Sequence, residues 1–307
     1  MNYIIKASLL LLILITAPTY AEDDTASSLY QQKKFTDAYP LFLKNAGAGD
    51  QSSFYTLGMM NQLGQGTEIN IPQALKWYLK AIDAGNLDAA FMAGELYNAN
   101  DTFILNYYEA ELLYKLALNG GLLKAALPLG RLYTTNVNGV VHMPTAVKYL
   151  EIAALDPLGG DAAAEAASFL SQIYRGNGKS IIANERTAFK WLEVAAENGD
   201  AAAAAAVGLS CYSGDKVEKN PAKAFRFIRS AASRGHGIAQ FNLGLFYYQG
   251  AGTRADPVKA LAWFMVAKNT DPATDNGTIE KFKAALTPTK NKAAMKEYKN
   301  LMLRFSK

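Results

Sequence analysis

The apolar residues of this chain recur at helical spacing, in pairs of short segments joined by glycine-containing turns. In the clearest pair, Leu243, Gly244 and Tyr247 mark one helix, and Ala260 and Trp263 mark the next. Side chains three and four positions apart lie on the same face of a helix, so each segment has one face to bury. The pattern predicts two antiparallel helices with a tight turn between them.

The same helix pair is repeated along the chain. Each copy has a small residue within the first helix, a small residue near the start of the second, and a bulky residue three positions later. The first set is Gly58, Gly94, Gly130, Ser171, Gly208 and Gly244; the second is Ala74, Ala110, Ala146, Ala188, Ala224 and Ala260; the third is Trp77, Leu113, Tyr149, Trp191, Phe227 and Trp263. Most steps are 36 residues, with one longer step between the third and fourth copies. Such a period predicts a stack of helix pairs in which each copy contacts its neighbours.

The marker residues have physical roles in such a stack. A glycine within a helix costs about 1 kcal/mol relative to alanine, which packing must offset, and it lets a neighbouring helix approach closely. The bulky residue is expected to fill the gap between one helix pair and the next.

These motifs resemble those of a known repeat family. Leu243-Gly244 with Tyr247 matches the motif LG-x-x-Y, and Lys259-Ala260 with Trp263 matches KA-x-x-W/Y. In these residues the chain resembles the Sel-one-like repeat (SLR) family, a branch of the tetratricopeptide superfamily, over about residues 52–269. The resemblance implies an all-α fold, a right-handed α/α solenoid of about seven helix-pair repeats with a C-terminal capping helix pair, which serves as a protein-binding scaffold.

The first residues have the pattern of a secretory signal peptide. Lys6 precedes an apolar run from Ser8 to Ile15, and Ala21 ends the segment before acidic Glu22. The apolar run is shorter than the ~20 residues of a membrane-spanning helix, so cleavage after Ala21 is favoured over a membrane anchor. We therefore expect export to the periplasm, with release to the extracellular medium as the alternative.

The pattern divides the chain into five parts. They are a signal peptide (1–21), an N-terminal tetratricopeptide-like unit (22–51), six Sel-one-like repeats (52–269), a linker (270–277) and basic C-terminal capping helices (278–307).

Two departures from the repeat are notable. An insertion of about five residues falls around Asp156–Asp161, which predicts either a longer surface loop or an interruption of the stack. The first helix of the fifth repeat opens with Ala201–Ala206, six alanines, which favours a helix with a locally flat inner face.

The C-terminal segment is basic and helical. Helices are predicted over Thr278–Leu286 and Lys290–Phe305, separated by Pro288. In the second helix, Met295, Tyr298, Met302 and Phe305 form one apolar stripe. From Thr278 onward there are eight basic and two acidic residues. We expect a helix that caps the last repeat, with peripheral contact to anionic lipid headgroups or to an acidic partner as the alternative.

The sequence contains no constellation of catalytic residues. The two histidines, His142 and His236, lie in turns of different repeats, and the turn at His236 is expected to end a helix with a partly cationic ring. Cys211 replaces a tyrosine of the other repeats and is expected to be a buried small side chain. Gly64-Gln65-Gly66 follows no strand and is a repeat turn, not a phosphate loop. We expect no enzyme activity, no cofactor and no bound metal.

Charge and cysteine content narrow the class of partner. The formal net charge is only +4, which argues against nucleic acid as the main partner. With one cysteine, the exported chain has no internal disulfide, so its stability depends on packing.

The resemblance also implies where a partner binds. In the family, the first helices of successive repeats line the concave side, and their contact positions lie −3, −2, +1, +4 and +5 from the mid-helix small residue. In this sequence these positions give Tyr55, Thr56, Met59, Gln62, Phe91, Glu95, Asn98, Arg131, Thr134, Gln172, Arg175, Leu209, Tyr212, Phe241, Asn242, Leu245, Tyr248 and Gln249. Their mixture of aromatic, amide and charged groups suits an extended peptide or a partner helix.

The first hypothesis is thus a periplasmic scaffold that binds a segment of another protein on its concave face and so regulates or assembles an envelope complex. Two alternatives remain at this stage: a cell-wall or glycan-binding protein, with or without hydrolytic activity, and a secreted factor that acts on a host cell.

Overall fold

The structure is a computed structural model, and it describes residues 23–99, 106–134, 141–177, 181–274 and 277–305. Within these ranges the chain is all-α: helices follow one another, and no strand occurs. No helix of the described ranges is long and apolar enough to cross a membrane. The predicted signal peptide, residues 1–21, lies outside the described residues.

The chain divides into two compact units, residues 1–113 and 114–307. The helices of unit 1 are α1 (Asp23–Gln31), α2 (Phe35–Gly47), α3 (Ser52–Leu63), α4 (Ile71–Asp83) and α5 (Leu87–Asn98). The unit boundary falls inside α6 (Tyr107–Asn119). In unit 1, α1 packs on α2 and α3 packs on α4, and each pair also contacts the helix that follows it.

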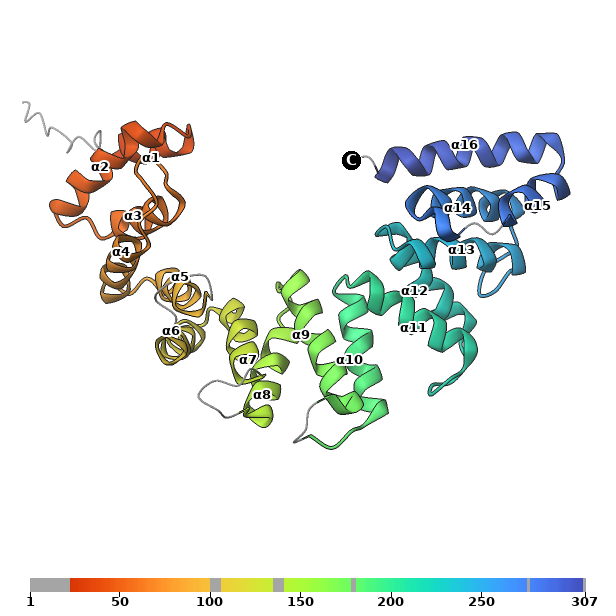
Figure 1. Cartoon of the computed structure of the whole chain (residues 1–307), viewed down its shortest axis with the longest axis horizontal. Coiled ribbons are helices and arrows are strands. Elements are labelled where there is room, and N and C mark those ends of the chain that lie inside the picture. Colours follow the sequence, from red (N-terminus) through yellow and green to blue (C-terminus); the bar gives the residue numbers. More distant parts are fainter. Residues whose placement is uncertain (1–22, 100–105, 135–140, 178–180, 275–276, 306–307) are drawn as a thin grey trace, which may run out of the picture. The chain divides into compact units, whose positions relative to one another are not determined.

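Unit 2 continues the helix pairs in chain order (Figure 1). Its first helices are α7 (Ala126–Thr134), α9 (Gly160–Gln172), α11 (Ala201–Ser213) and α13 (Gly237–Gln249), and their second helices are α8 (Met143–Ala154), α10 (Glu185–Glu197), α12 (Pro221–Ser233) and α14 (Pro257–Thr270). A π-helical turn, η2 (Ile173–Asn177), extends α9, and short 3-10 turns, η1 (Leu123–Ala125) and η3 (Pro272–Thr274), precede α7 and follow α14. From α7 to α14 each helix packs on the next along the chain, which is the architecture of an all-α solenoid.

The mid-helix glycines lie where two helices approach closely, as predicted. A Cβ atom at Gly58 would lie 2.5 Å from the ring of Tyr78, and one at Gly244 would lie 2.6 Å from the ring of Phe264. The same contact pairs Gly130 with Leu150 and Gly208 with Ile228. These four covering side chains are fully buried. The glycine therefore makes room for a large side chain of its own repeat's second helix.

The covering residue is not the bulky marker seen in the sequence but the residue after it. The markers have a separate role: Phe227 and Trp263 are buried in the hydrophobic cluster that runs through the repeats of unit 2. Trp77, Tyr149 and Trp191 are only half-buried. Two adjacent positions thus have different roles. The residue after the marker packs on the glycine of its own repeat, whereas the marker itself, where buried, packs between repeats.

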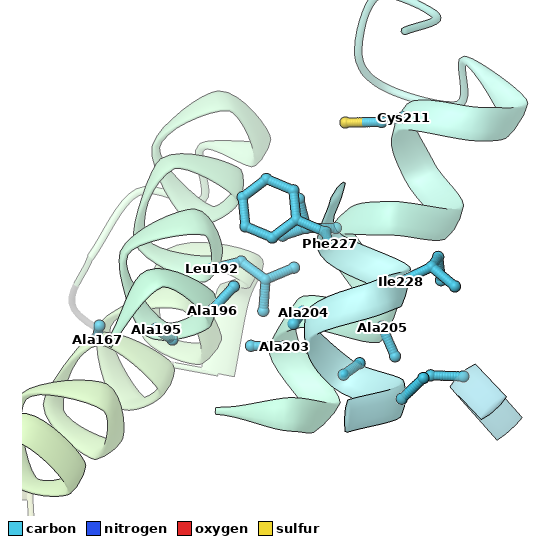
Figure 2. Close-up of a cluster of buried hydrophobic side chains, with 14 of the residues drawn as sticks. Ala167, Leu192, Ala195, Ala196, Ala203, Ala204, Ala205, Cys211, Phe227 and Ile228 are labelled. Carbon is cyan, nitrogen blue, oxygen red and sulfur yellow. The ribbon is translucent and has the colours of Figure 1, made fainter. Parts of the chain in front are cut away.

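The alanine-rich helix α11 packs closely against its neighbours. Ala203, Ala204 and Ala205 are buried. Figure 2 shows these small side chains close to Leu192 of α10 and to Phe227 and Ile228 of α12. Because alanine projects only a methyl group, the neighbouring helices can approach α11 closely.

The insertion is divided between a loop and a helix. The loop between α8 and α9 spans residues 155–159, two residues longer than the loop between α4 and α5. α9 also begins four residues further ahead of its mid-helix small residue, Ser171, than α11 does ahead of Gly208. α8 and α9 pack together as the other consecutive helices do, so the stack is not interrupted there.

Most second helices begin with a side-chain cap, which lies at the same position of each repeat. The side-chain oxygens of Asn70, Asn184, Asn220 and Asp256 accept hydrogen bonds from backbone N–H groups in the first turns of α4, α10, α12 and α14. Such caps contribute about 1 kcal/mol each, because they satisfy N–H groups that have no partner within the helix.

His236 lies in the turn that ends α12, as predicted, and its N–H donates to the carbonyl oxygen of Ala231 at 3.1 Å, but it also begins the next helix. Gly235, with φ +87°, lies in the turn that follows α12, and His236 is the N-cap of α13. Its Nδ1 accepts a hydrogen bond from the N–H of Ala239 at 3.2 Å. Asn86 and Asp200 occupy the equivalent cap position before α5 and α11.

The C-terminal segment forms α15 (Thr278–Ala285) and α16 (Pro288–Phe305). α16 lies along α14, the second helix of the last repeat (Figure 1). The predicted stripe was displaced by one residue: Ala294 and Leu301 are the buried residues, whereas Met295 and Phe305 are exposed. Tyr298 and Met302 are partly buried beside Leu301. The short side chain of Ala294, not the bulk of Met295, fits the contact.

Candidate partner-binding surface

The surface predicted to bind a partner lies on the first helices, and in unit 2 we call it the first-helix face. It comprises the side chains at the predicted contact positions of α7, α9, α11 and α13. Arg131, Gln172 and Arg175 are exposed, Leu209 is 40% exposed and Tyr212 is half-buried. These residues come from three successive first helices and η2, whose backbones are fixed by the buried small residues beneath them.

Side-chain contacts connect the helices along this face. The Arg131 guanidinium forms an ion pair with Glu165 of α9, and it also lies 5.9 Å from the ring of Phe169. Phe169 and Glu165 were missed by the sequence analysis, although Phe169 occupies the −2 position of its repeat. The hydroxyl of Thr134 donates to the carbonyl oxygen of Arg131 at 2.8 Å. Arg131 is therefore positioned by its own neighbours and is less available to a partner than predicted.

A second link joins α11 to α13. The hydroxyl of Tyr212 donates to Oε1 of Gln249 at 2.8 Å, and its ring lies 4.8 Å from that of Phe246. Two predicted contact residues from successive repeats are thus brought together. The phenol ring is held in place while one side remains accessible.

In the last repeat, part of the predicted surface also packs against the chain itself. Phe241 and Leu245 are partly buried against a cluster that includes Phe264 of α14 and Ile279 of α15. The ring of Tyr248 meets the ring of Phe282 of α15 edge-on at 4.8 Å, although Tyr248 remains 56% exposed. Asn242 is half-buried. The apolar side chains of this repeat serve the fold of the C-terminal segment, and the part of the face that is open to a partner runs from α7 to α11 and Gln249.

In unit 1 the predicted residues lie on α3 and α5, and all of them are half-buried: Tyr55, Thr56, Met59, Gln62, Phe91, Glu95 and Asn98. The hydroxyl of Tyr78 donates to Oε1 of Gln62 at 2.6 Å. Burial raises the pKa of Tyr78 above its usual value, with smaller contributions from Tyr55 and Tyr30, so the phenol remains a protonated donor. Gln62 is accordingly committed in part to the second helix of its own repeat.

Metal-binding groups and the single cysteine are the other candidates for chemistry. The described residues contain no cluster of histidine, cysteine, aspartate and glutamate that could hold a metal ion. Burial raises the pKa of the Cys211 thiol, so it stays protonated within the core rather than acting as a nucleophile. His142 precedes α8 and shares a short contact of 2.6 Å with the hydroxyl of Thr145.

The fold defines an all-α repeat protein, and comparisons with known proteins identify the class. The family model of the Sel1 repeat matches residues 55–86, 164–200, 201–236 and 237–264. These matches and the similar solved structures assign the repeats of this chain to the Sel1-like repeat family. A search of curated proteins finds no match.

Two solved structures have a similar fold. A Sel1 repeat protein from Oxalobacter formigenes is 25% identical, with a TM-score of 0.57 over 81% of this chain and 99% of that one. A protective antigen present in uropathogenic Escherichia coli strains, which displays an SLR fold, is 23% identical, with a TM-score of 0.59 over 92% of this chain. This chain spans 62% of the length of that antigen. The Sel1 repeats of this chain indicate a scaffold for protein–protein interaction.

Proposed function

We propose that this chain is an exported, non-enzymatic scaffold that binds a segment of another envelope protein on the first-helix face of unit 2. The observation that supports the proposal best is the exposed row of Gln172, Arg175 and Leu209. These residues lie on successive helix pairs of a packed repeat array. An extended peptide contacts such a row through amide and guanidinium groups that fix its register and through leucine, which adds apolar contact.

The test is a comparison of two triple variants. Q172A, R175A and L209A together should reduce partner capture at least tenfold, because the apolar and charge-assisted contacts are lost together. The measurement is crosslinking in the producing cells, with a photoreactive amino acid introduced at Gln249, followed by mass spectrometry of the adduct.

The matched control replaces an amide, a cation and a leucine on second helices or at their ends, in N119A, L155A and K190A. All three residues are exposed, so both triple variants should retain the wild-type melting temperature. If both variants lost the adduct equally, or if neither lost it, the first-helix face would not be the binding surface.

Export is a separate part of the proposal and rests on residues 1–21. We expect the protein isolated from the periplasmic fraction to begin at Glu22. N-terminal sequencing of the fractionated protein measures this directly. An intact Met1 in the cytoplasmic fraction would contradict export, and recovery mainly from the culture medium would favour the secreted host-interaction alternative.

A further inference from the structure

A recess is lined by residues of the C-terminal helix α16 and of α12 and α14. It has a volume of about 480 Å³, within the range of ligand-sized pockets. Trp263 and Leu301 form part of its lining and are 7% and 5% exposed, so they make a largely buried apolar floor. Tyr247 of α13 also lines it. None of these three residues belongs to the first-helix face, although Trp263 and Tyr247 are also markers of the repeat.

The charged side chains around this recess are mostly cationic. Those that line it are Arg226, Arg229, Lys259, Arg304 and a single carboxylate, Glu297. They come from three different helices, so the folding of α16 onto the last repeat gathers the cations. A group that enters the recess meets an excess of three positive charges.

Two of these cations already have acidic neighbours, and two do not. Arg226 lies 3.5 Å from Glu197, and Lys259 lies 3.4 Å from Asp256. Arg229 and Arg304 form no ion pair with any residue that the structure describes.

The Arg229 guanidinium is also held in place by its surroundings. It lies 5.7 Å from the ring centroid of Phe225, within the range of a cation–π contact. A guanidinium that is oriented in this way and has no carboxylate partner is suited to bind one in two-pronged geometry.

We propose that this recess binds an acidic peptide segment, in which carboxylate side chains meet Arg229 and Arg304 and an aliphatic side chain rests on Trp263 and Leu301. A peptide fits better than a membrane, because the apolar floor lies inside a recess that single side chains can enter and a flat bilayer surface cannot. The site would give the scaffold a second attachment point that is independent of the first-helix face.

The test uses the full mature chain and a fluorescein-labelled peptide of about seven residues that alternates leucine with glutamate. Fluorescence anisotropy should show binding of this peptide but not of its leucine–glutamine counterpart. R229Q and R304Q together should weaken binding tenfold or more, since each removes a charge-assisted contact. Binding should also weaken as salt is raised from about 50 to 500 mM.

The control pair, R186Q and R254Q, removes the same charge from exposed arginines outside the recess and should leave the affinity within about twofold. Circular dichroism melts of both pairs verify the fold. Failure of the acidic peptide to bind, equal losses in both pairs, or binding confined to phosphatidylglycerol vesicles would each overturn the proposal. The Q172A, R175A, L209A protein should bind the peptide normally, which separates this site from the proposed partner surface.

Discussion

Gly252→Ala should destabilise unit 2 by about 2–5 kcal/mol. Gly252 has φ +66°, a left-handed conformation that costs an alanine about 1–2 kcal/mol. Its Cβ atom would also lie 2.0 Å from the carbonyl oxygen of Pro221, the first residue of α12 in the preceding repeat. Because that neighbour is backbone, relief requires α12 to shift, at a further cost of about 1–3 kcal/mol. Urea titration followed by circular dichroism gives the change in unfolding free energy.

Gly235→Ala is the matched control for this prediction. Gly235 also has a left-handed φ, +87°, but a Cβ atom there would have no neighbour within 4 Å. Its replacement should cost only the conformational term of about 1–2 kcal/mol. If the two variants were equally stable, the contact with Pro221 would have no energetic role in the spacing of the repeats. Gly66 occupies the same kind of position in unit 1, since a Cβ atom there would lie 2.2 Å from the carbonyl oxygen of Phe35.

The sequence was sufficient to predict the repeated unit, because its markers have strict steric causes. A residue without a side chain is needed where Tyr78 or Phe264 crosses a first helix, so glycine recurs there in five of the six copies, with Ser171 in the other. The helix pairs, the close contact at the glycine and the burial of Cys211 all followed from this spacing.

Adjacent positions could not be distinguished in the same way. Trp263 and Phe264 are both large and apolar, and helical periodicity places both near the same face. Only the structure shows that Phe264 covers Gly244 while Trp263 packs into the cluster shared between repeats. The capping role of His236 was missed for a related reason: one short turn both ends α12 and begins α13, so a single residue can be assigned to either helix.

The candidate surface was less predictable than the fold. The contact positions follow the repeat period, but α15 lies outside the repeats. The repeat pattern therefore does not indicate that Phe282 packs on α13, the first helix of the last repeat. The same pattern predicts Phe241 and Leu245 as partner contacts without indicating that they are partly buried against the chain itself. Similarly, the ion pair of Arg131 depends on Glu165, which lies outside the expected contact positions.

Phe264→Ala should have the largest effect on the stability of the C-terminal repeats. The side chain is 1% exposed, and its ring lies 5.1 Å from Phe241 and 4.9 Å from Phe282. Its removal leaves a cavity between the last repeat and α15, which costs about 3–5 kcal/mol. The loss should appear in the urea-induced unfolding transition, with amide hydrogen exchange showing the greatest loss of protection in α13 to α15.

A double-mutant cycle with Gly244→Ala tests whether the ring and the glycine act as a pair. In the wild-type background the new methyl group would meet the Phe264 ring at 2.6 Å, so the variant should lose about 1–2 kcal/mol despite the better helix propensity of alanine. In the Phe264→Ala background the ring is absent and the nearest remaining neighbour is the carbonyl oxygen of Ala260 at 3.1 Å, so the same change should cost less than in the wild type, down to no cost. Gly237→Ala, on the same helix but with its nearest neighbours at 3.6 Å, should cause no loss in either background. If the effects of Gly244→Ala and Phe264→Ala were additive, the small residue at position 244 would not be needed to make room for the Phe264 ring.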